Sequence, residues 1–160
     1  MLRNKHFIAA LLITPILSII AYFATDMVVS EKPHAAIKGQ SYKMISLSNC
    51  RYTSGLCDMK NGDFTIRFHA ESLTDSQLGL KLSAKHTLSD VKLSLVDHQE
   101  QNTPPTNMKP LDNTGQHWHI SLPKPSSADS WLRVVVLAEG SLYYGETQTA
   151  FVKHETLFTK

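Results

Sequence analysis

Beyond residue 40 the chain consists of short segments in which hydrophobic and polar side chains alternate. This pattern is typical of β-strands with one buried and one exposed face. In residues 63–70 every second side chain from Phe64 to Phe68 is apolar. Residues 56–60 precede that segment across Asn61-Gly62, the preferred dipeptide of a tight hairpin turn. We therefore predict that the two segments form a β-hairpin.

Six further segments show alternation or a continuous apolar run and are predicted as strands: residues 42–47, 78–84, 91–95, 117–122, 131–138 and 142–152. The apolar run at 131–138 is expected to be covered on both faces. Residues 97–116 are polar and contain three prolines, which predicts a long loop. Seven or eight strands separated by turns predict an all-β fold, an antiparallel immunoglobulin-like β-sandwich over residues 42–152.

Residues 7–25 form an uncharged, hydrophobic run near the N-terminus. A helix of these 19 residues would be about 28 Å long at about 1.5 Å per residue, close to the thickness of a bilayer's hydrocarbon core. Arg3 and Lys5 precede the run, whereas Asp26 follows it directly. This asymmetry predicts a cytoplasmic N-terminus at residues 1–6 and one transmembrane helix, an anchor at residues 7–29.

The predicted orientation places the rest of the chain in the periplasm, at a bacterial inner membrane. Residues 30–41 are then a linker, residues 42–152 the periplasmic β-sandwich and residues 153–160 a C-terminal tail. A cleaved signal peptide is the alternative, because it has the same order of charge and hydrophobicity. Its hydrophobic region is usually shorter, and bulky Tyr22 lies where cleavage after Ala24 would need a small residue.

Composition limits the function classes. Sixteen Lys and Arg against 14 Asp and Glu give a net charge of +2 without any basic run, which argues against a nucleic-acid partner. The sequence contains no nucleophile elbow, phosphate-binding loop, H-E-x-x-H zinc motif or dinucleotide fingerprint. We expect a protein that is not an enzyme, with the lipid bilayer and a membrane protein complex as its partners.

Cys50 and Cys57 are the only cysteines, and they enclose six residues. In an oxidising compartment they are expected to form a disulfide, and Gly55 gives the enclosed segment the freedom to bend back. Metal-binding pairs usually enclose two to four residues and thioredoxin-like redox pairs enclose two. The spacing therefore argues against both alternatives.

The motif His117-Trp118-His119 is the best candidate for chemistry. Residues i and i+2 of a strand point to the same side, so both imidazoles would leave the sheet together. With a third ligand such a pair could bind copper or zinc, and Met108 is the predicted soft ligand, with His69 and His86 as alternatives. The same spacing also arises when polar residues simply fill the solvent face of an amphipathic strand.

Tyr143-Tyr144 and the two tryptophans could form an aromatic surface that binds sugars. Strand alternation, however, sends Tyr143 and Tyr144 to opposite faces. At most one of the two is then exposed, and core packing is the favoured role.

Residues 114–136 resemble the FixH-like proteins, which combine a short cytoplasmic start, one membrane helix and a small periplasmic β-domain. Gly115-Gln116-His117-Trp118, followed by Ile120 and Leu122, is similar to the G-x-W strand near the end of that family's domain. The family's members are accessory proteins of haem–copper oxidase maturation or cation handling. The resemblance implies a non-enzymatic, single-pass protein that binds or helps assemble a membrane complex such as a respiratory oxidase. The alternative is a copper-binding or copper-delivery domain using His117, His119 and Met108.

Overall fold

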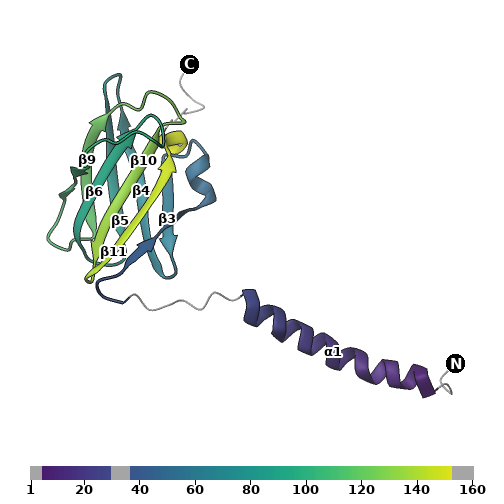
Figure 1. Cartoon of the computed structure of the whole chain (residues 1–160). Helices are drawn as coiled ribbons and strands as arrows, with labels where there is room; N and C mark the ends of the chain where they lie inside the picture. The colour runs from purple at the N-terminus through teal and green to yellow at the C-terminus, as the bar shows by residue number, and fades with distance from the viewer. Residues whose placement is uncertain (1–4, 30–36, 153–160) are drawn as a thin grey trace. The chain divides into compact units, whose positions relative to one another are not determined.

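The computed structural model describes residues 5–29 and 37–152 (Figure 1). Its first element is an apolar helix, α1 (Lys5–Val29). Side chains from Ile8 to Thr25 are all exposed, and hydrophobic residues lie on every side of the helix. Its hydroxyl groups donate to carbonyl oxygens one turn earlier, as Thr14 does to Ala10 at 2.7 Å. The helix is long and apolar enough to cross a membrane, a form that membrane spans share with signal sequences.

The second unit of the chain contains two β-sheets packed face to face (Figure 1). Sheet A contains, in spatial order, β1 (Ser41–Lys43), β11 (Ser141–Gln148), β10 (Trp131–Ala138), β6 (Leu88–Val96) and β7 (Thr106–Asn107). Sheet B contains β2 (Ile45–Ser46), β3 (Leu56–Asn61), β4 (Phe64–Leu73), β5 (Gln77–Ala84), β9 (His117–Pro123) and β8 (Lys109–Pro110).

The strand order has the topology of an immunoglobulin-like sandwich. In sheet B the order β4-β5-β9-β8 corresponds to strands A, B, E and D of that fold, and β3 and β2 extend it. In sheet A the order β6-β10-β11 corresponds to strands C, F and G. Within residues 37–152 seven strands have six or more residues, and every pairing is antiparallel except that of β1 with β11. The predicted fold is confirmed.

Alternating side chains of the long strands fill the space between the sheets. Sheet B contributes Ile66 and Phe68 of β4, and sheet A contributes Val134 and Val136 of β10, all 1% exposed or less. Each fully buried Val, Leu, Ile or Phe side chain stabilises the fold by roughly 1.5–3 kcal/mol relative to an exposed one. The alternation read from the sequence therefore identifies the two inner faces.

Two predicted strands are corrected by the structure. Residues 42–47 do not form one strand: β1 joins sheet A and β2 joins sheet B, because buried Met44 lies between them and donates its N–H to the Tyr144 carbonyl at 2.7 Å. The strand predicted at 142–152 ends at Gln148. A 3₁₀ turn, η2 (Thr149–Val152), follows it and inserts Phe151 into the core.

The predicted loop 97–116 contains the two short strands β7 and β8. Its first part is held against the outer face of sheet A by side chains of β10 and β6. Arg133 donates to the carbonyls of Gln99 and Gln101, and the Ser94 hydroxyl donates to the Thr103 carbonyl at 3.0 Å. Both sheets thus end in strands of two or three residues: β1, β7, β2 and β8.

Candidate functional site

Cys50 and Cys57 form a disulfide, which confirms the pairing predicted from their spacing. Cys50 lies on the 3₁₀ turn η1 (Ser48–Arg51) and Cys57 on β3, and their exposed fractions are 2% and 0%. The disulfide therefore attaches η1 to sheet B from within the core. Thiol–disulfide exchange needs access for an attacking thiolate, so this buried bond has the environment of a structural crosslink.

His117 and His119 lie half-buried on the outer face of sheet B, with Trp118 buried between them, as alternation predicts. Each imidazole lies near a different carboxylate: His117 Nε2 is 4.0 Å from Asp112 Oδ2, and His119 Nδ1 is 4.0 Å from Glu71 Oε2. The other ring nitrogen of His117, Nδ1, is buried without a hydrogen-bond partner. It is therefore closed to a ligand that approaches from solvent.

Asp112 is held by a local turn. Hydrogen bonds from the hydroxyl (2.5 Å) and backbone N–H (2.9 Å) of Thr114 to Oδ1 lower the pKa of Asp112 below its usual value of 3.8. These two donors already occupy one of the two carboxylate oxygens of Asp112. Asp112 therefore orders the turn before β9 and has only its second oxygen directed at His117.

Met108 is not a ligand on the face that carries the histidines, which corrects its predicted place in the copper site. It lies between β7 and β8, is 4% exposed and belongs to the core between the sheets, and its N–H donates to Val91. His69 and His119 are both paired with Lys81, which separates them on β5. His86 lies 3.6 Å from Glu139 instead.

Over residues 5–29 and 37–152, no three His, Cys, Asp or Glu side chains are grouped to hold a metal ion. The outer face of sheet B carries paired charges as well. The Arg67 guanidinium donates to both oxygens of Asp58 at 2.6 and 2.8 Å, and this hydrogen-bonded carboxylate raises the pKa of Arg67. This face is polar and occupied by internal contacts.

The outer face of sheet A is different, because it carries an apolar block of four side chains: Val135, Leu137, Leu142 and Tyr144. Val135 is paired with Tyr144 and Leu137 with Leu142, so the four lie together on adjacent strands. Val135 and Leu137 are each 36% exposed and Tyr144 is 41% exposed. The prediction that residues 131–138 are covered on both faces is wrong at Val135 and Leu137, whose side chains the structure leaves exposed.

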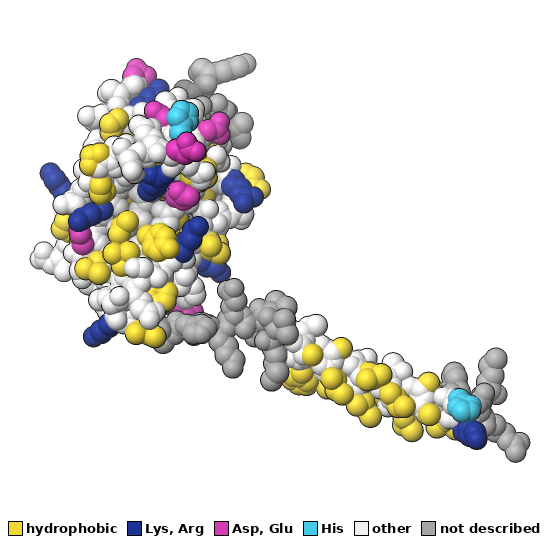
Figure 2. Space-filling model, in the orientation of Figure 1, with side chains coloured by type: hydrophobic (Ala, Val, Ile, Leu, Met, Phe, Trp, Pro, Cys, Tyr) yellow, Lys and Arg dark blue, Asp and Glu magenta, His cyan; other side chains and the backbone are white. Residues whose placement is uncertain are grey.

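Charged side chains flank the apolar block. Strand pairing places Lys43, Tyr144, Val135 and Lys92 in one row across the sheet. Lys92 lies 3.4 Å from Asp90, whereas Lys43 has no ion pair with any described residue. In Figure 2, where this sheet faces the viewer as in Figure 1, hydrophobic side chains gather on the surface between basic ones.

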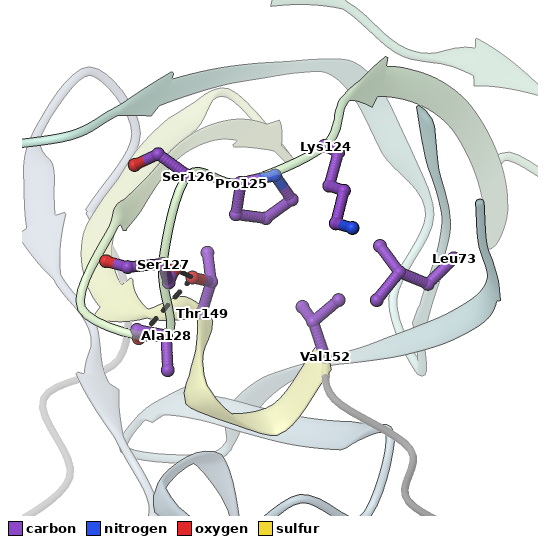
Figure 3. Close-up of a pocket in the computed structure, with 8 residues that line it drawn as sticks. All are labelled: Leu73, Lys124, Pro125, Ser126, Ser127, Ala128, Thr149 and Val152. Atoms are coloured by element: carbon purple, nitrogen blue, oxygen red, sulfur yellow. Dashed lines mark hydrogen bonds between the residues drawn. The ribbon is translucent and has the colours of Figure 1, made fainter. Parts of the chain in front are cut away.

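A cavity of about 230 Å³ opens at one end of the sandwich, between the end of β4, the β9–β10 connection and η2. Leu73, Pro125, Ala128 and Val152 form its apolar wall (Figure 3). Among the eight described residues that line it, Lys124 is the only charged one, and Figure 3 shows its ammonium group directed toward the space between Leu73 and Val152. A neighbouring groove of about 320 Å³ shares Lys124 and Ser126.

No family model matches this chain, and no curated protein matches it. Among solved structures, the crystal structure of a Br derivative of BhCBM56 is similar at a TM-score of 0.36 and 14% sequence identity, over 54% of this chain and 89% of that one. This similarity is too low to bear on function.

Proposed function

We propose that this protein is a non-enzymatic, membrane-tethered binding module of the bacterial inner membrane. Its N-terminus lies in the cytoplasm, α1 spans the bilayer, and the disulfide-bonded sandwich lies in the periplasm. There the sandwich binds or helps assemble a membrane protein complex. A respiratory oxidase is the complex that the resemblance to FixH-like proteins suggests.

The apolar block on sheet A is the observation that carries this proposal. Soluble domains usually expose hydrophobic side chains singly, and a contiguous apolar group rimmed by charge is typical of a protein–protein contact. The block lies on regular, paired strands, so its backbone loses little conformational freedom when a partner covers it. The same face carries Asp90 and Glu146 beside its basic residues, which favours a protein partner over an anionic lipid surface.

The tether supports the same conclusion. Four side chains offer far less area than the roughly 800 Å² per partner of a stable complex, so the contact alone would be weak. Confinement of both partners to one membrane raises their effective concentration and compensates for a small interface. A membrane helix joined to a modest apolar surface is therefore a consistent pair of features.

The test is co-purification of the full-length protein in mild detergent from its native membranes. A variant with Val135→Ser and Tyr144→Ser removes the centre of the block. We expect the amount of complex that co-purifies with this variant to fall at least tenfold. The matched control is Thr65→Ser with Ser83→Ala, on the outer face of sheet B, where strand pairing places both residues away from sheet A.

The control variant should unfold within about 0.5 kcal/mol of the native chain, as exposed substitutions usually do. The sheet A variant should stay folded but lose about 1 kcal/mol of unfolding free energy, because it removes a cross-strand pair. An unchanged complex in the sheet A variant would contradict the proposal. Equal loss in the control variant would also contradict it, because the binding would then not depend on the apolar block.

A further inference from the structure

We propose that the cavity beside Lys124 binds a small carboxylate that carries a short apolar chain. This site lies at the end of the sandwich, apart from the apolar block, and does not depend on the function proposed above. Its volume of about 230 Å³ is below the range of roughly 300–1,000 Å³ typical of drug-sized ligands, so the ligand is small.

The wall of the cavity sets the apolar half of this ligand. Leu73 is the last residue of β4 and keeps 40% of its surface exposed, although it faces Pro125 and Val152 across the cavity. An alkyl chain placed there would cover the Leu73 side chain and gain about 25 cal/mol for each Å² of apolar surface removed from water. A wholly polar ligand would leave this surface uncovered.

Lys124 sets the charge of the ligand. No carboxylate lines the cavity among the described residues, and no ion pair to Lys124 occurs in the described chain. An ammonium group beside an apolar wall can form a charge-assisted hydrogen bond with a ligand that brings the anion. The aliphatic stem of Lys124 adds to the apolar wall while its head stays near solvent.

The backbone around the cavity is fixed before any ligand arrives. Lys124 donates its N–H to the Ser76 carbonyl at 3.0 Å, and Thr149 donates its N–H to Ser130 at 2.8 Å. The Thr149 hydroxyl donates to the Ser127 carbonyl at 2.9 Å, across the cavity's polar side (Figure 3). Such preorganisation lowers the entropy cost of binding, which matters most for a ligand with few atoms.

The experiment uses the full-length protein in nanodiscs with isotope-labelled Leu and Val methyl groups, titrated with hexanoate. We expect saturable NMR shifts at the methyl groups of Leu73 and Val152, with a dissociation constant on the order of 1 mM. Hexanamide has the same shape without the charge, and it should bind at least tenfold more weakly. Lys124→Met keeps the aliphatic stem and should lower the affinity for hexanoate by a similar factor.

Lys81→Met, on the outer face of sheet B, is the matched control and should bind hexanoate as the native chain does. Equal affinity for hexanoate and hexanamide would overturn the proposal, even if the Lys124 variant failed to fold. Shifts that do not saturate, or that persist unchanged in Lys124→Met, would overturn it as well.

The carboxylate could come from a free acid or from the C-terminus of a peptide. Acetyl-Ala-Leu with a free carboxylate, compared with its amide, separates these two sources. Tighter binding of the dipeptide acid than of hexanoate would assign the site to a peptide terminus. Weaker binding of the dipeptide acid than of hexanoate would assign the site to a free acid. In either case the dipeptide amide should bind more weakly than the dipeptide acid.

Discussion

Gly115 and Gly39 both have positive φ, at 69° and 86°, but their surroundings differ. A Cβ at Gly115 would lie 2.8 Å from the Leu88 carbonyl oxygen, whereas a Cβ at Gly39 would have nothing within 4 Å. Gly39→Ala should therefore cost about 1 kcal/mol of unfolding free energy for its left-handed backbone alone. Gly115→Ala should cost clearly more, and denaturant unfolding of the two variants would measure the difference.

The crowding at Gly115 also explains the Gly115-Gln116-His117-Trp118 motif. The Gly115 carbonyl accepts hydrogen bonds from Trp118 Nε1 at 2.9 Å and from the Leu88 N–H at 2.8 Å. The glycine and the tryptophan thus hold the start of β9 against the start of β6. Equal stability of the Gly115→Ala and Gly39→Ala variants would show that this contact is unimportant.

Asp112 makes stability depend on pH. The Thr114 hydroxyl bond is the largest cause of its lowered pKa. A carboxyl group whose pKa is lowered by folding stabilises the fold above its unfolded pKa and loses that effect as the pH falls through its folded pKa. Asp112→Asn should therefore lower the Tm at neutral pH, and the difference from the native chain should disappear in strong acid. A Tm difference that is constant with pH would contradict this linkage.

Single residues also show the limit of prediction for the candidate site. Alternation was enough to place His117 and His119 on one face, because it depends only on local strand geometry. The position of Met108 could not be read in this way, since the turn between β7 and β8 decides whether its side chain faces solvent or core. The apolar block was missed for a similar reason: the apolar run at 131–138 does not say which of its faces another element covers.

The disulfide links two elements, η1 and β3, across a small ring. A ring of this size removes little conformational freedom from the unfolded chain, so Cys50→Ala plus Cys57→Ala should lower the free energy of unfolding by roughly 2–3 kcal/mol. The variant should keep a cooperative unfolding transition, followed by circular dichroism. Loss of cooperativity would show that the crosslink is required for the fold itself.

Elements with local signals were predicted well, and those with distant partners were not. The hairpin of β3 and β4 turns at Asn61-Gly62, where Gly62 has a φ of 55°. By contrast, residues 42–47 are divided between two sheets because Met44 bonds to Tyr144, about a hundred positions away in the chain. The alternation within residues 42–47 gives no sign that the chain passes from one sheet to the other at Met44.

The orientation of the whole chain is testable with reporters fused after Lys160. A reporter that is active only outside the cytoplasm should be active, and one that is active only in the cytoplasm should be silent, because basic residues precede the apolar run. The reverse pattern would contradict the proposed topology. It would also place the disulfide in a reducing compartment, where it would be difficult to maintain.

A retained anchor and a cleaved signal peptide differ at the mature N-terminus. We expect mass spectrometry of the protein from native membranes to find residues 1–29 still attached. Extraction should need detergent, since α1 exposes hydrophobic side chains on all sides. A mature chain that starts between residues 25 and 37 would show that the segment is a signal peptide.

The short strands that end each sheet affect how the protein behaves at high density. In the proposed tethered arrangement copies on one membrane meet often, and a long unpaired strand would let them join edge to edge and aggregate. Here each sheet ends in strands of only two or three residues. The end strands therefore offer few unpaired backbone groups from which crowded copies could build a continuous cross-β array.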